Sequence, residues 1–167
     1  MANAVVKFMR VDTRMVHGQI ITKWTTINQC KHVMIIDKLL DSDPFMSSFY
    51  KKAAQKGVKI DVTSPEKAKK AWDNDKFGPS DKNLLVVFRD ATNAYNTWKL
   101  GFPMEALDLG NQVDAAGKKQ ISREVFLSED EFNKLKEMND AGVHVYMQVI
   151  PEDTPTEFDA IAKVFNS

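Results

Sequence analysis

The residues best suited to chemistry surround His17, in the segment Arg10-Val-Asp-Thr-Arg-Met-Val-His-Gly-Gln19. The apolar run 4–9 predicts a strand before it, and residues 20–27 repeat apolar side chains at the spacing of a helix. A turn from strand to helix presents unpaired backbone N–H groups and the positive end of the helix dipole, which together favour a bound anion. The pattern therefore points to a histidine that takes up or passes on a phosphoryl group.

A histidine that accepts a phosphoryl group needs a neutral, oriented ring nitrogen. We expect Asp12 to orient either that imidazole or the loop. The planar fork of Arg14 suits bidentate pairing with phosphate oxygens, so we expect Arg14 to offset the phosphate charge. Arg10 has two interpretations, which the sequence leaves open: it binds phosphate, or it locks the loop by pairing with Asp12.

Three further residues belong to the same predicted phosphate-binding loop. Gly18 lacks a Cβ atom and so allows close approach by the phosphate and histidine of a second protein. Gln19 is expected to donate to a phosphate oxygen or to stabilise the turn, and Thr13 is grouped with them. The competing interpretation is an ion-paired surface loop in which His17 is only a cap or an exposed side chain.

Composition excludes several other classes of protein. The chain has 167 residues, with 23 basic and 23 acidic side chains, so its zero net charge gives no reason to expect nucleic acid. The single cysteine, Cys30, rules out an internal disulfide, and no Cys/His pattern resembles a zinc site. No apolar run approaches the roughly 20 residues that span a bilayer. We expect one domain, 1–167, with no metal and no cofactor.

Short apolar runs alternate with amphipathic segments, and runs such as 84–88 show no polar alternation. This is typical of a parallel sheet covered by helices on both faces. We therefore predict an α/β fold, a single doubly wound domain whose mainly parallel central sheet has about six to seven strands. The predicted strands after the first are 32–37, 58–62, 84–88, 105–109, 121–127 and 143–149.

Helix-capping residues mark where the predicted helices begin. Caps are expected at Asp43, Ser64, Asp90 and Ser128, the last with Glu131 as a capping box, and a final helix is expected over 156–165. The helix after Asp43 is predicted to repeat its apolar residues at Phe45, Phe49, Ala53 and Ala54 and to end at Gly57.

The segment 10–20 resembles the active-site segment of the enzyme IIB component of the bacterial sugar phosphotransferase system, in its mannose/fructose/sorbose class. The pattern of that class is roughly R-[IV]-D-[DE]-R-[LFM]-[IV]-H-G-Q-[IV]. The similarity covers almost the whole chain. Other matching stretches are Gly110-Asn111, 116–122, 125–131 and 142–151.

This resemblance implies a phosphocarrier that acts without ATP. His17 would accept a phosphoryl group on its Nδ1 atom, the acceptor in this family, from a phosphohistidine on the IIA domain. It would pass the group to the sugar entering through the IIC and IID membrane subunits. The protein would be cytoplasmic and peripherally associated with that transporter, without itself spanning the membrane. Because the pattern starts near Val5, we expect a chain without a fused IIA domain.

Two positions depart from the family pattern. Thr13 stands where many relatives carry an acidic residue, which removes one negative charge from the loop. Residues 111–114 read Asn-Gln-Val-Asp, where many relatives have Asn-Ile or Gly-Met after the glycine. We expect Thr13 to leave phosphate binding intact and to alter docking of IIA, and the 111–114 segment to bear on sugar preference.

The sequence also bears on two other functions. The alternative to the carrier is a regulatory or binding module of the same fold that is phosphorylated but does not support sugar uptake. A hydrolase using His17 and Asp12 is disfavoured, because no nucleophile elbow or second catalytic histidine motif occurs.

Overall fold

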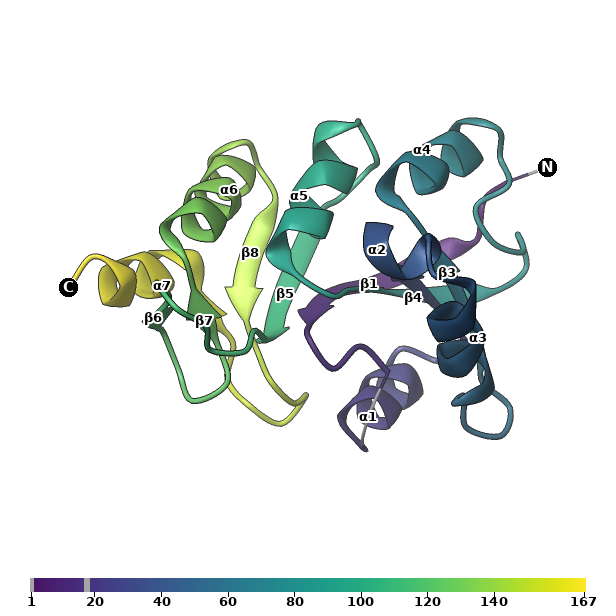
Figure 1. The fold of residues 1–167 in the computed structure, drawn as a ribbon, viewed down its shortest axis with the longest axis horizontal. Coiled ribbons are helices and arrows are strands. Elements are labelled where there is room, and N and C mark those ends of the chain that lie inside the picture. The colour runs from purple at the N-terminus through teal and green to yellow at the C-terminus, as the bar shows by residue number, and fades with distance from the viewer. Residues whose placement is uncertain (1, 17–18) are drawn as a thin grey trace.

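The computed structural model describes residues 2–16 and 19–167, with the side chains of Gln19 and Ile20 excepted. Within this part of the chain, seven strands form one sheet in the order β3-β2-β4-β1-β5-β8-β9 (Figure 1). Neighbouring strands run parallel except β8 and β9, and β6 with β7 forms a separate antiparallel pair. The strands are β1 (Val5–Asp12), β2 (His32–Ile36), β3 (Lys59–Thr63), β4 (Asn83–Phe88), β5 (Ala106–Asn111), β6 (Lys119–Gln120), β7 (Phe126–Leu127), β8 (His144–Met147) and β9 (Thr156–Glu157).

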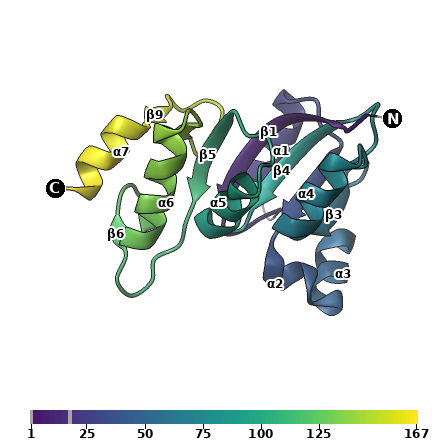
Figure 2. The same ribbon diagram turned by 90° about the horizontal axis from the view of Figure 1, so that it is seen from above.

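Helices cover both faces of this sheet, as predicted. In Figure 1, α4 and α5 lie above β1 and β4, and α1 lies below them. Figure 2 shows the same arrangement from above. The helices are α1 (Gln19–Ile27), α2 (Lys38–Asp41), α3 (Pro44–Lys52), α4 (Pro65–Asp73), α5 (Ala91–Lys99), α6 (Glu129–Asp140) and α7 (Phe158–Phe165).

Alternate residues of β4 explain why its sequence shows no polar alternation. Leu84, Val86 and Phe88 pack into the apolar cluster beneath α4 to α7. Leu85 and Val87 pack into a second cluster with residues of α1, α2 and α3. Both faces of the strand are therefore buried, as expected for a parallel sheet between two helical layers. The predicted doubly wound α/β fold is confirmed.

The helix starts predicted at the four capping residues are correct, whereas the final helix begins at Phe158 and not at 156. Asp43 accepts a hydrogen bond from the backbone of Met46 at 3.0 Å, and Ser64 and Asp90 cap α4 and α5 in the same way. Ser128 and Glu131 form the reciprocal capping box at the start of α6. Local chemistry alone fixes these ends, because each cap satisfies backbone N–H groups that the helix itself leaves free.

Other predicted elements were wrong. Residues 121–127 do not form one strand, because the backbone N–H groups of Ile121 and Ser122 both donate to Val125, which turns the segment back on itself. The helix after Asp43 ends at Lys52 and not at Gly57. Its predicted apolar stripe faces solvent at Phe45 and Phe49, while Met46, Ser47 and Tyr50 face inward. The short elements α2 and β9 were not predicted.

The order in which the chain adds strands to the sheet reverses beside β1. From β1 the chain passes through α1 to β2 on one side, and from β4 it passes through α5 to β5 on the other side of β1. In open parallel sheets, ligands bind at the carboxyl ends of the strands where the order reverses in this way. The carboxyl ends of β1, β4 and β5 are therefore the part of the fold that positions a site.

Gly110 interrupts the pairing of β1 with β5 at this edge. Val11 pairs with Leu109 and Asp12 with Asn111, so Gly110 is the extra residue of a bulge. A Cβ atom built on Gly110 would overlap the guanidinium of Arg10, which is fully buried. Glycine is required here because that guanidinium lies directly against the backbone.

We predict that Gly110→Ala lowers the free energy of unfolding by about 3 kcal/mol, since it forces a buried charge out of its place. Urea denaturation measures the change. Gly117→Ala is the matched control: its Cβ would meet no atom within 4 Å, and its positive φ of 82° accounts for a loss of only about 1 kcal/mol. Equal losses in the two variants would contradict the close packing of Arg10 on Gly110.

Candidate functional site

The Arg10 side chain lies buried at the carboxyl end of β1 and connects several elements. Its Nη1 donates to Asp108 Oδ2 of β5 at 2.5 Å and to the backbone oxygen of Gln148 after β8 at 2.8 Å. Its Nε donates to Asp12 Oδ2 at 3.3 Å, and its Cζ lies 5.3 Å from the centre of the Trp24 ring. The contact with Asp12 agrees with the loop-locking interpretation, while Nη2 is buried without a hydrogen-bond partner in the described part of the chain. A phosphate contact by Arg10 stays a prediction.

Asp108 is the second carboxylate of this buried group. Burial raises the pKa of its side chain to about 7, against the lowering effect of the Arg10 guanidinium. The backbone N–H of Gln148 also donates to Asp108, at 2.8 Å. These contacts join the ends of β5 and β8 to β1.

Asp12 organises the turn that follows β1. Its Oδ1 accepts from the backbone N–H of Arg14 at 2.9 Å and from Arg14 Nε at 3.2 Å, and its Oδ2 accepts from Arg14 Nη2 at 3.2 Å. Met15 follows with a positive φ of 57° and is buried. In the described residues, the Asp12 carboxylate thus orients the loop and the Arg14 fork.

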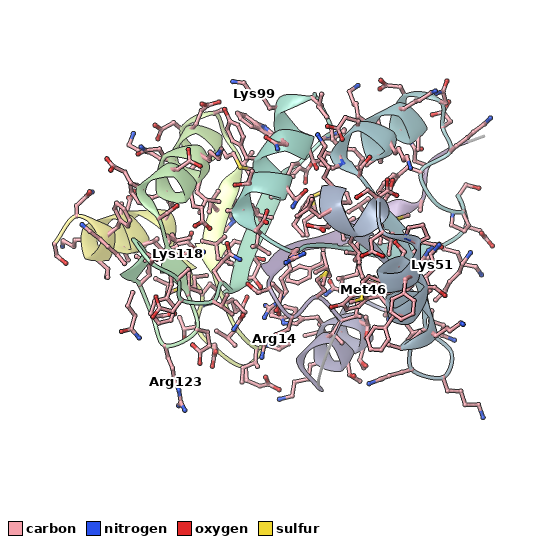
Figure 3. The ribbon with its side chains drawn as sticks, viewed as in Figure 1. Arg14, Met46, Lys51, Lys99, Lys118 and Arg123 are labelled. Atoms are coloured by element: carbon pink, nitrogen blue, oxygen red, sulfur yellow. The ribbon has the colours of Figure 1, made fainter. Side chains whose placement is uncertain are left out.

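Arg14 reaches the surface at this edge, below the sheet beside α1 (Figure 3). Its side chain is 37% exposed, whereas that of Asp12 is only 7% exposed. Because Nε and Nη2 bind Asp12, the guanidinium is held in one orientation while Nη1 makes no hydrogen bond within the described part of the chain. The arrangement leaves a guanidinium of fixed orientation at the surface, a geometry that suits pairing with an oxyanion.

Thr13 and Gln112, at the two departures from the family pattern, are hydrogen-bonded to each other. Gln112 Nε2 donates to Thr13 Oγ1 at 3.1 Å and to the backbone oxygen of Arg89 at 3.3 Å, and its Oε1 accepts from the backbone of Ala91 at 3.3 Å. The Thr13 backbone N–H also donates to the Asn111 oxygen, at 3.0 Å. Gln112 is buried. Through these hydrogen bonds its side chain connects the ends of β1, β4 and β5.

Arg89 was not predicted from the sequence. It follows β4, its side chain is 45% exposed, and its Nη1 lies 3.8 Å from Asp37 Oδ2. Asp37 is itself buried, which raises its pKa, and it accepts from Leu40 and Asn93 at 2.8 Å each. The available signal was a polar residue directly after the strongest predicted strand, which places a second cation at the carboxyl edge.

The segment after β8 closes the other side of the site. Trp24 Nε1 of α1 donates to the backbone oxygen of Val149 at 3.1 Å, and Lys23 pairs with Glu152 at 3.3 Å. Together with Gln148, these contacts explain what the family-like run 142–151 does in the fold. It packs the chain after β8 against both Arg10 and α1.

The structure brings together Arg10, Asp12, Thr13 and Arg14 at this edge. Gln19 begins α1, and its side chain is not among those described. His17 and Gly18 lie outside the described residues, between the turn at Met15 and the start of α1. Their predicted roles therefore stay predictions.

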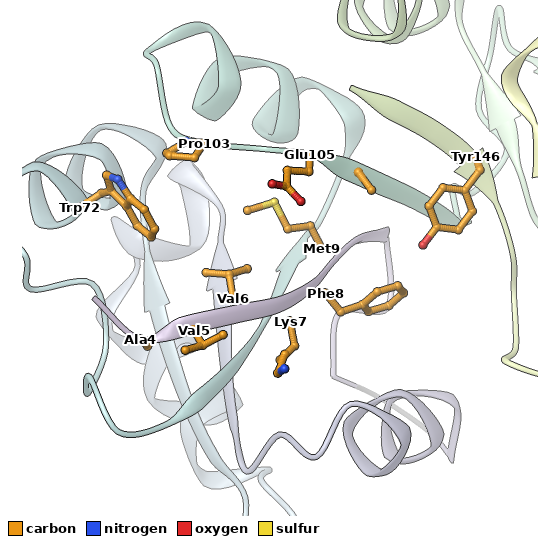
Figure 4. A pocket seen from close by; sticks show the side chains of 11 residues that line it. Ala4, Val5, Val6, Lys7, Phe8, Met9, Trp72, Pro103, Glu105 and Tyr146 are labelled. Atoms are coloured by element: carbon orange, nitrogen blue, oxygen red, sulfur yellow. The ribbon is translucent and has the colours of Figure 1, made fainter. Parts of the chain in front are cut away.

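A cavity of about 540 Å³ lies elsewhere, between the amino-terminal half of β1 and β5. Trp72, Glu105 and Tyr146 line it (Figure 4), and burial raises the pKa of Tyr146. It contains none of the residues that the sequence analysis selected. Separately, no helix in the described ranges is both long and apolar enough to cross a membrane.

Comparison with known proteins decides the family. A model of the PTS system sorbose subfamily IIB component matches residues 6–166. The chain belongs to this family. It is thus an IIB component of the sugar phosphotransferase system, and the resemblance stated from the sequence is confirmed.

Individual relatives agree with this assignment. The sorbose-specific EIIB component of Lacticaseibacillus casei is 27% identical over 160 residues, covering 96% of this chain and 95% of that protein. Among solved structures, manxB from Thermoanaerobacter tengcongensis matches with a TM-score of 0.89 and 28% identity over 100% of both chains. The IIBSor domain of the Klebsiella pneumoniae sorbose permease has the same fold, with a TM-score of 0.87 at 24% identity over 95% of this chain and 97% of that one.

We predict that Thr13 and Gln112 are energetically coupled. Thr13→Val and Gln112→Ala should each reduce the free energy of unfolding, by about 1–3 kcal/mol for Gln112→Ala, because buried backbone groups lose their partner. The double variant should lose less than the sum by about 1 kcal/mol. Urea denaturation of the four proteins measures this, and Thr13→Ser, which keeps the hydroxyl, should behave like the parent. Additive losses would show that the hydrogen bond between the two side chains contributes nothing.

Proposed function

We propose that this IIB component is a phosphocarrier in which His17 accepts a phosphoryl group from phosphorylated IIA and transfers it to the incoming sugar at the IIC and IID membrane subunits. Family membership supports the general role. The observation that supports this loop as the site is the orientation of Arg14. Asp12 holds its guanidinium at the carboxyl edge of the sheet, three residues before residue 17.

Both transfers are in-line displacements at phosphorus. A ring nitrogen of His17, Nδ1 by the family resemblance, forms a bond to phosphorus as the phosphorus–nitrogen bond to the donor histidine breaks. The electron pair of that bond stays on the donor ring. In the second step a sugar hydroxyl oxygen attacks phosphorus, His17 leaves with the electron pair of the broken phosphorus–nitrogen bond, and the hydroxyl proton passes to water.

The work of the protein in such transfers is positioning and charge compensation. Arg14 supplies a guanidinium of fixed orientation. Because Asp12 already restricts this side chain, little further conformational entropy is lost when it binds phosphate. The backbone N–H groups at the start of α1 (Gln19–Ile27) add the positive end of a helix dipole. Gly18 gives room for the partner, and Gln19 donates to the phosphate or supports the turn.

Transfer between proteins also requires an accessible site. The group around Arg14 lies at an edge of the sheet and not in the 540 Å³ cavity between β1 and β5. An open edge suits a phosphoryl group that must meet first IIA and then the membrane subunits. We place the protein in the cytoplasm, in peripheral association with that transporter.

The test is to incubate the chain with phosphoenolpyruvate, enzyme I, HPr and a matching IIA, and to measure the intact mass under neutral or basic conditions. We predict a gain of one phosphate that acid removes and that His17→Ala abolishes. His144→Ala is the matched control, since His144 is an exposed histidine paired with Glu157 far along the chain, and it should keep the gain.

Two results would contradict the proposal: a gain that persists in His17→Ala, or no gain from two different IIA proteins that are shown to be phosphorylated. Sugar uptake by the transporter reconstituted with the parent chain then separates the carrier from a regulatory module. Uptake that requires His17 supports the carrier, and phosphorylation without uptake supports the module.

A further inference from the structure

The neighbouring helices α2 and α3 carry three exposed apolar side chains, Leu39, Phe45 and Phe49, which we call the α2–α3 ridge. These side chains are 70%, 79% and 51% exposed, respectively. Large exposed apolar groups that gather on one surface of a protein mark contact with a partner or a membrane. Met46, Ser47 and Tyr50 form the inner face of α3. Phe49 meets the edge of the Tyr50 ring at a centroid distance of 5.6 Å and is still half exposed, and Phe45 is the more exposed of the two.

The outer face of α3 combines these rings with positive charge. Phe45, Phe49 and Lys52 are spaced by four and three residues, so they follow one another along one side of the helix. Lys51 and Lys56 are exposed close by (Figure 3 labels Lys51 at the end of α3). None of these three lysines has an ion-pair partner within the described part of the chain.

The acidic groups near the ridge are already engaged. Asp41 pairs with Lys67 at 2.8 Å, and Asp43 accepts the capping hydrogen bond from Met46. Glu66 lies 3.9 Å from Lys38. The capping bond leaves the charge of Asp43 in place, so three lysines without an ion pair stand against one such carboxylate. The ridge therefore keeps a positive excess around exposed rings, which is complementary to a surface that is apolar inside and anionic at its rim.

From this geometry we infer that the α2–α3 ridge rests on an anionic phospholipid surface, with Phe45 and Phe49 inserted among the lipids and Lys51, Lys52 and Lys56 at the headgroups. Insertion of apolar side chains together with attraction of lysines to anionic lipids is how peripheral helices bind bilayers. A second copy of the chain fits less well, because it would bring lysines against lysines. The inference does not depend on phosphorylation of His17.

Binding to such a surface would also orient the site. Met46 and Tyr50, on the inner face of α3, belong to the same apolar cluster as Met15 and Val16. The ridge is thus joined through the core to the end of the phosphate-binding loop. A protein held by α3 would keep that loop at a fixed place relative to the bilayer.

The test is sedimentation of the full chain with vesicles of phosphatidylglycerol and phosphatidylcholine in equal parts, at low salt, and with vesicles of phosphatidylcholine alone. We predict that the parent chain binds the anionic vesicles. Phe45→Ser and Phe49→Ser should each weaken this binding about 10-fold, so the double variant should lose both factors. Lys51→Gln/Lys52→Gln should weaken binding about 5-fold per lysine, on the anionic vesicles only. Val164→Ser, at a 45% exposed valine on α7, is the control and should bind like the parent.

Thermal unfolding checks that the ridge variants remain folded, and Phe45→Ser alone serves if the double variant does not. The inference is overturned if the parent does not sediment with the anionic vesicles, or if binding survives in the phenylalanine variants. It is also overturned if sedimentation velocity without lipid shows a dimer that these substitutions abolish, because the occupant of the ridge would then be a second copy.

Discussion

The constraint on which this structure depends is a charge buried beside the end of β1. A guanidinium taken out of water is tolerated only when it is paired and hydrogen-bonded. Arg10 meets most of that requirement: Nε and Nη1 bind Asp12, Asp108 and the backbone oxygen of Gln148, and its Cζ lies over the Trp24 ring. Its Nη2 is buried and has no hydrogen-bond partner among the described residues. Four separate segments of the chain must therefore come together around one side chain. The same packing leaves no room for a side chain on β5 at Gly110.

This constraint divides the work between the two arginines of the loop. Arg10 is buried and fixes the position of Asp12, and Asp12 in turn holds the turn and the fork of Arg14. Of the two, only Arg14 reaches the surface, so under the proposed function it is the arginine that pairs with the phosphoryl group. The sequence places both guanidiniums within one polar run, and their opposite roles follow from burial alone. Gln112 fixes the same loop from the side of β5 through Thr13.

The sequence was sufficient where local chemistry or repeated burial decides the structure. The run 84–88 is apolar on both sides because both faces of β4 are covered, and the caps at Ser64 and Asp90 act within their own helix turns. It was insufficient where distant contacts decide. The pairing of Arg10 with Asp108 joins residues far apart in sequence, and no spacing rule distinguishes it from a phosphate contact.

The wrong predictions have the same origin. Phe45 and Phe49 have the spacing of a buried stripe, yet the helix turns Met46 inward because α3 packs beside the cluster of Met15 and Tyr50. A pattern of apolar residues reports that a face avoids water, and it does not say whether the core or another surface covers it. The position of Arg89 at the carboxyl edge was not predicted, because its partner, Asp37, lies at the end of a different strand.

The most direct test of this division of labour is the ¹H–¹⁵N spectrum of the arginine Nε–H groups, recorded before and after phosphorylation of the chain. The Arg14 signal should move on phosphorylation and be restored when the phosphoryl group is removed, while the Arg10 signal should stay in place. Movement of Arg10 together with Arg14, or an unchanged Arg14 signal in a phosphorylated protein, would contradict the account.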